Sequence, residues 1–150
     1  MKTTEKLLSE DTCRKALFQF WTEQTEIVET GEGLALALPL LYPDGWQVQL
    51  FVEPVSRDQA ILTDQGRTLG WLQDQRVNWE GGQTGELLQS RLEAFELKQD
   101  GFELQRRIRL PLVGLDVHLF GEALVAIAHL AYRHEAHCPA EGGRVPLQSG

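Results

Sequence analysis

The sequence Leu-Thr-Asp-Gln-Gly-Arg-Thr-Leu-Gly-Trp-Leu, residues 62–72, marks a change from strand to helix near the middle of the chain. Its first residues are typical of a strand end, Asp64-Gln65-Gly66 of a sharp turn, and the remainder of a short helix. A turn of this kind places a carboxylate, a glycine and free backbone amides together. The arrangement can cap a helix, hold a catalytic carboxylate or bind an anion, and the residues alone leave these alternatives open.

Three strands are predicted on the N-terminal side of this turn. Residues 34–41 alternate larger and smaller apolar side chains, which predicts a strand covered on both faces. Pro43-Asp44-Gly45 predicts a hairpin turn into a second strand, residues 46–53, which Pro54 should end by removing a backbone donor. A third strand covers residues 60–63. Connections this short allow only an antiparallel meander.

Helices and one later strand are predicted around the meander. Residues 9–24 form an amphipathic helix whose apolar face includes Cys13, which we therefore expect in the core. A second long helix begins at a Thr84 cap and precedes a strand at residues 102–110. The last helix spans residues 116–134, and we expect its inward face to consist of Phe120, Ala123, Leu124, Ile127, Ala128 and Ala131.

The sequence thus predicts an α+β fold, with an antiparallel sheet of about four strands packed with three to four helices. Residues 1–135 are expected to form a single domain, and residues 136–150 a disordered tail.

Composition narrows the classes of function. The chain of 150 residues carries 14 Lys and Arg against 22 Asp and Glu, a net charge of −8. Such a charge disfavours direct binding of nucleic acid and favours a cationic protein partner, although it can also serve solubility alone. Residues 1–10 are charged and polar, so no signal peptide is expected, and the sequence has no apolar run of about 20 residues. No membrane association and a cytoplasmic location are therefore expected.

Four residues are candidate partner-binding residues. Asp64 is either a helix cap or a site carboxylate. Trp79, in a glycine-flanked loop, can anchor a partner or fold back onto the edge of the core. Arg106 interrupts an apolar strand face and must find an acidic partner or a ligand anion. Its expected partners within the chain are Asp64 and Glu53. A small-ligand site at the residue 64–68 amides and Arg106 is a further alternative.

No catalytic set, cofactor site or metal site is predicted. A metal-dependent nuclease needs converging carboxylates, and Asp44, Asp58 and Asp64 lie in separate turns. His134, His137 and Cys138 invite a zinc interpretation, but we interpret them as a solvated helix end running into the tail.

Residues 38–72 resemble the core of a family of bacterial and phage proteins, the domain of unknown function 1828. The likeness lies in an apolar strand, a second strand and a Leu-Thr-Asp-x-Gly-x-Thr-x-x-x-Leu segment, matched here by Leu62, Thr63, Asp64, Gly66, Thr68 and Leu72. The resemblance implies a small domain carried by phages and mobile elements, with no established activity and no catalytic residues to transfer. Gln65 stands where the family often has a second acidic residue.

These observations predict a non-enzymatic, acidic interaction protein of phage or mobile-element type. It is expected to inhibit a host defence complex by binding a cationic protein surface, on a nucleic-acid-binding complex, and a homodimer is compatible with the sequence. The alternative is a metal-dependent nuclease or hydrolase that uses Asp64.

Overall fold

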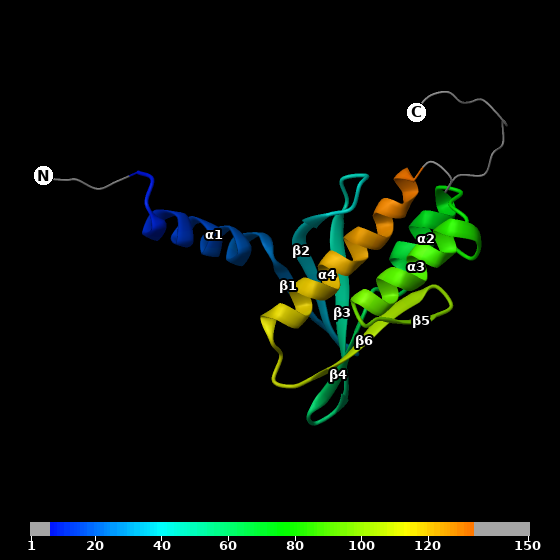
Figure 1. Ribbon diagram of the computed structural model, residues 1–150. Helices are drawn as coiled ribbons and strands as arrows, with labels where there is room; N and C mark the ends of the chain where they lie inside the picture. The colour runs from blue at the N-terminus through cyan, green and yellow to red at the C-terminus, as the bar shows by residue number, and fades with distance from the viewer. Residues whose placement is uncertain (1–6, 134–150) are drawn as a thin grey trace, which may run out of the picture.

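The computed structural model describes residues 7–133, and both His134 and the predicted tail, with His137 and Cys138, lie outside them. The described chain is an α+β fold, as predicted (Figure 1). Its elements are, in chain order, α1 (Glu10–Gln24), β1 (Glu26–Thr30), β2 (Gly33–Leu41), β3 (Gln47–Ser56), β4 (Gln59–Thr63), α2 (Arg67–Asp74), α3 (Gly82–Ala94), β5 (Lys98–Asp100), β6 (Glu103–Arg109), α4 (Gly114–Ala128) and a 3₁₀ turn, η1 (His129–Tyr132).

Between residues 7 and 133 the sheet has six strands in the order β1-β2-β3-β4-β6-β5, with antiparallel neighbours throughout. The expected number of about four was therefore wrong. The predicted meander is β2-β3-β4, and the later strand is β6. β1 and β5 were not predicted because both are short and polar and lack a clear alternation of apolar residues. They form the two edges of the sheet.

The core lies between the sheet and α4. This helix contacts β2, β3, α2 and α3, and α2 also contacts β6. The predicted inward face of α4 is confirmed, with Phe120, Leu124 and Ile127 fully buried. Together α4 and η1 are long and apolar enough to cross a membrane by length and composition, but half of that segment is buried in this fold. We therefore interpret it as a core helix.

The apolar strand β2 is covered on one face rather than two. Leu36 and Leu38 are buried beneath α4, whereas Ala35 and Ala37, on the opposite face, are only partly buried. Pro54 does not end β3, which continues to Ser56 across a register irregularity. A bulge of this kind accommodates a residue without a backbone donor.

The position of α1 differs most from expectation. The helix begins as predicted, because the Ser9 hydroxyl accepts a hydrogen bond from the Thr12 N–H at 3.1 Å. None of its residues is buried within the described chain, and Cys13 is exposed. Figure 1 shows why: α1 extends away from the body of the fold past the β1 edge. Most of its apolar face is thus exposed in the described chain, where only Trp21 among its apolar residues is partly buried.

Candidate functional site

The Asp64 turn joins the end of β4 to the start of α2. Asp64 is completely buried. Its Oδ1 accepts hydrogen bonds from the N–H groups of Gly66 at 2.8 Å and Leu104 at 3.0 Å, and its Oδ2 accepts from Thr68 N–H at 3.0 Å. The carboxylate therefore satisfies the start of α2 and also holds β6. The helix-cap alternative describes this geometry.

Details of the cap differ from the prediction. Gly66, not Asp64, occupies the N-cap position, with a φ of 82° that disfavours any side chain. The Asp64 carboxylate accepts from the Gly66 and Thr68 amides, and the Asp64 backbone carbonyl accepts from the Arg67 N–H at 3.2 Å. Because the Gly66 and Thr68 amides are donated to Asp64, they are not directed at an external anion. The anion-site alternative thus finds no support in this arrangement.

Side chains around the turn extend the same network. The Thr63 hydroxyl donates to the Glu103 carboxylate, and the Tyr42 hydroxyl shares a hydrogen bond of 2.9 Å with the Thr68 hydroxyl. Burial raises the pKa of Tyr42 to about 12, with nearby Asp64 adding to the rise and Thr68 opposing it. Residues 42, 63, 64, 68 and 103 therefore form a polar cluster that connects β2, β4, α2 and β6.

Arg106 does not reach either predicted acidic partner. It lies opposite Leu62 and hence on the core face of the sheet. Glu53 lies opposite Ile61 and hence on the other face. The Arg106 guanidinium instead contacts the Glu96 carboxylate at 3.5 Å. The expectation of an ion pair with Asp64 or Glu53 was therefore wrong. The actual partner, Glu96, is brought beside Arg106 by the turn that follows α3, which the sequence pattern did not indicate.

Trp79 lies in the core rather than on an exposed loop. Its side chain is 5 % exposed, and its ring meets the Phe102 ring edge-on, with 5.4 Å between centroids. The loop is nevertheless hollowed. A cavity of about 420 Å³ is lined by Trp79, Glu80, Gly81, Gly82, Gly85, Glu86, Gln89 and Gln99. We call these residues the Trp79 hollow.

The Trp79 hollow combines acceptors and donors. The exposed carboxylates of Glu80 and Glu86 stand beside the glycine-rich first turn of α3, and Gln99 closes the hollow from β5. None of the lining residues in this part of the chain is basic. The sequence prediction found Trp79 but missed both glutamates. The adjacent Trp-Glu-Gly-Gly sequence was the available signal, whereas Gln99 is brought in only by the fold.

The sequence-predicted residues therefore do not converge on one site. Asp64 is in the polar cluster, Trp79 in the hollow, and Arg106 and Glu53 on opposite sheet faces. Their partner-binding role stays a prediction. Within residues 7–133, no group of three or more His, Cys, Asp or Glu side chains is placed to hold a metal ion.

The fold and these sites define a small α+β domain with a structural Asp-Gln-Gly turn at residues 64–66 and an acidic surface hollow. The chain belongs to the family described as Domain of unknown function DUF1828, whose sequence model matches residues 38–127. The resemblance found in the sequence is thereby confirmed. Comparisons with curated proteins and with solved structures give no match.

Proposed function

We propose that this domain is a non-enzymatic binding module of phage or mobile-element type, which acts in the cytoplasm against a host defence complex. It binds a cationic protein surface through the Trp79 hollow. One observation carries the proposal: the hollow offers two exposed carboxylates, and none of its lining residues in the described chain is basic. The net charge of −8 acts in the same direction.

The chemistry of the hollow fits a Lys or Arg side chain on an extended segment. Glu80 and Glu86 accept charge-assisted hydrogen bonds from the cation. Backbone N–H groups at the beginning of α3 donate to the peptide carbonyls beside it. The glycine backbone at residues 81 and 82 leaves room for the aliphatic part of the cationic side chain.

A cationic groove that normally holds nucleic acid is the partner surface that suits this charge. An acidic domain is attracted to such a groove over distances of about a Debye length, roughly 8 Å at physiological ionic strength. Binding there excludes nucleic acid without any bond-breaking step. The proposal therefore requires no catalytic residue, cofactor or metal.

Charge reversal in the hollow tests the proposal. The double variant Glu80→Arg/Glu86→Arg is compared with Glu93→Arg, an exposed position further along α3. Purified proteins are assayed for inhibition of the common defence systems, and for binding of the inhibited complex at increasing salt. We expect the double variant to lose inhibition and the control to retain it. Absence of inhibition by the unmodified protein in every system contradicts the proposal.

The nuclease or hydrolase alternative stays a prediction. Its experiment is a Mg²⁺ and Mn²⁺ titration with nucleic-acid substrates, comparing the unmodified protein with Asp64→Ala. Cleavage that the substitution abolishes, in a variant shown to be folded, would favour the enzyme. The geometry adds nothing to this alternative, since both Asp64 oxygens accept backbone hydrogen bonds.

A further inference from the structure

Most of helix α1 lacks a packing surface in the single chain. Three of its large apolar side chains are at least half exposed, namely Leu17 60 %, Phe18 74 % and Phe20 50 %, and Trp21 alone is partly buried. Contact with the body is made near its C-terminal end, where the Trp21 ring meets the His118 ring at 5.5 Å and the Gln47 side chain donates to the Gln24 carbonyl at 3.2 Å. A helix of 15 residues is marginal in water without tertiary packing. A second surface must therefore cover it.

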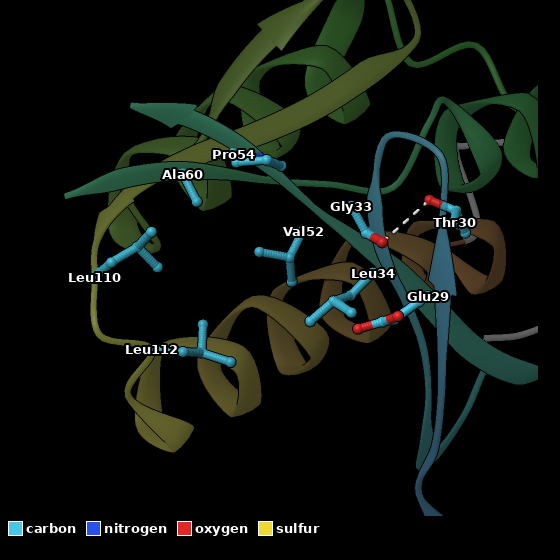
Figure 2. Close-up of a pocket in the computed structure, with 9 residues that line it drawn as sticks. All are labelled: Glu29, Thr30, Gly33, Leu34, Val52, Pro54, Ala60, Leu110 and Leu112. Atoms are coloured by element: carbon cyan, nitrogen blue, oxygen red, sulfur yellow. Dashed lines mark hydrogen bonds between the residues drawn. The ribbon is translucent and has the colours of Figure 1, made fainter. Parts of the chain in front are cut away.

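An apolar groove lies on the helix-bearing face of the sheet (Figure 2). Its volume is about 490 Å³, and it is lined by Glu29, Thr30, Gly33, Leu34, Val52, Pro54, Ala60, Leu110 and Leu112. These residues come in turn from β1, β2, β3, β4 and the segment between β6 and α4. The groove thus crosses the strands from the β1 edge inward.

We propose that the α1 helix of a second copy occupies this groove, and that two chains exchange their helices about a two-fold axis at β1. The β1 strand is an open edge with five exposed residues, and unpaired edge groups readily accept another strand. Pairing two β1 strands antiparallel about Val28 sets Glu26 opposite Thr30 of the second copy and Ile27 opposite its Glu29. Glutamates then never face each other directly.

This pairing brings each helix to the groove. The chain passes from α1 into β1 through Thr25, so the partner's helix emerges beside the Thr30 end of β1, where Glu29 and Thr30 line the groove. A rotation about an axis normal to the sheet leaves both helices on the same face as α4. The groove and the incoming helix therefore both adjoin the proposed β1–β1 pairing. This is our reason for assigning the groove to a second copy of the chain.

The length of α1 agrees with the number of strands that the groove crosses. A 15-residue helix is about 22 Å long, which spans four to five strands at about 4.8 Å each. The groove draws its sheet residues from β1 to β4. Leu17 and Phe20 of the visiting helix then reach the level of Leu34 and Val52. The interface is isologous, so every contact occurs twice.

Solution mass tests the exchange. The unmodified chain is expected to sediment as a dimer, and Leu17→Glu/Phe20→Glu to show a twofold lower mass. Trp46→Glu is the matched control, because Trp46 is 75 % exposed in the turn between β2 and β3, away from the groove. Circular dichroism verifies that each variant is folded. A monomeric unmodified chain, or a dimer that survives the double substitution, overturns the proposal.

Cross-linking between two differently altered chains locates the helix. Cys13 lies 11 positions before Gln24, about 16 Å along the helix, and so should approach Leu112 of the second copy. One chain carries Cys138→Ser and retains Cys13; the other carries Cys138→Ser, Cys13→Ser and Leu112→Cys. Mild oxidation of the mixture is expected to join the two chains. Failure to cross-link, with Trp46→Cys in place of Leu112→Cys as the background control, overturns this placement.

The inference does not depend on the proposed function, because neither α1 nor the groove includes a residue of the Trp79 hollow. A dimer with an inactive hollow, or a monomer with an active one, separates the two proposals.

Discussion

The polar cluster around Asp64 and the α1 helix differ in how many of their contacts the described chain itself supplies. Each buried oxygen of Asp64 has its hydrogen-bond donors within the fold, whereas Leu17 and Phe20 on the apolar face of α1 stay at least half exposed in the described chain. An element whose polar and apolar groups all find partners inside one chain serves the fold. An element that leaves such groups exposed is a candidate for contact with another chain. Three predictions test this difference.

The largest effect is expected at the polar cluster. Asp64→Ala leaves the buried N–H groups of Gly66, Thr68 and Leu104 without acceptors, and we expect a loss of about 4 kcal/mol in the free energy of unfolding. Urea unfolding measures the loss. Asp64→Asn, which keeps one oxygen, should lose less. A loss below about 1 kcal/mol for the alanine variant would contradict the structural role.

The same leucine-to-alanine substitution should lower the free energy of unfolding by different amounts in the core and in α1. Leu62→Ala removes a completely buried side chain and should cost about 3 kcal/mol. Leu17→Ala, in α1, should change the free energy of unfolding by less than about 0.5 kcal/mol in dilute protein. The Leu17 variant should become relatively less stable as concentration rises, because association then contributes. Equal losses at both positions in dilute protein would invalidate the comparison.

The smallest expected effect is a pH dependence at Tyr42. The folded chain keeps the phenol proton to a pKa of about 12, whereas the unfolded chain ionises near 10. The contribution of Tyr42 is therefore fully present below pH 10 and is lost as the pH rises towards 12, by up to about 2 kcal/mol. Urea unfolding between pH 9 and 11.5 should show this decline, and Tyr42→Phe should lack it. Parallel pH profiles for both proteins would refute the assignment.

How much the sequence could predict depended on how local the deciding contacts are. The β4–α2 turn was predicted well, because Asp64, Gly66 and the apolar residues around them carry the signal within a few positions. The edge strands β1 and β5 were missed, since their residues are polar and their pairing depends on neighbouring strands. The partner of Arg106 was misassigned for the same reason: Glu96 comes close only once α3 has turned into β5.

The apolar face of α1 illustrates a different limit. Its periodicity correctly predicted an amphipathic helix, but periodicity indicates that a face needs cover and not what covers it. The Trp79 hollow was indicated in part by local sequence and depends in part on the fold. Its glutamates sit near Trp79 in sequence, yet their common orientation depends on the first turn of α3.

The hydrogen bond from Leu104 N–H to Asp64 has a consequence for how the chain assembles. It joins positions 40 residues apart, and those residues contain α2, α3 and β5. The Asp64 carboxylate before α2 thus acquires its third hydrogen-bond donor only when β6 has reached its final register. A motif that looks local in the sequence is in this way completed by a distant strand. An insertion or deletion in the segment between residues 64 and 104 should therefore disturb the start of α2.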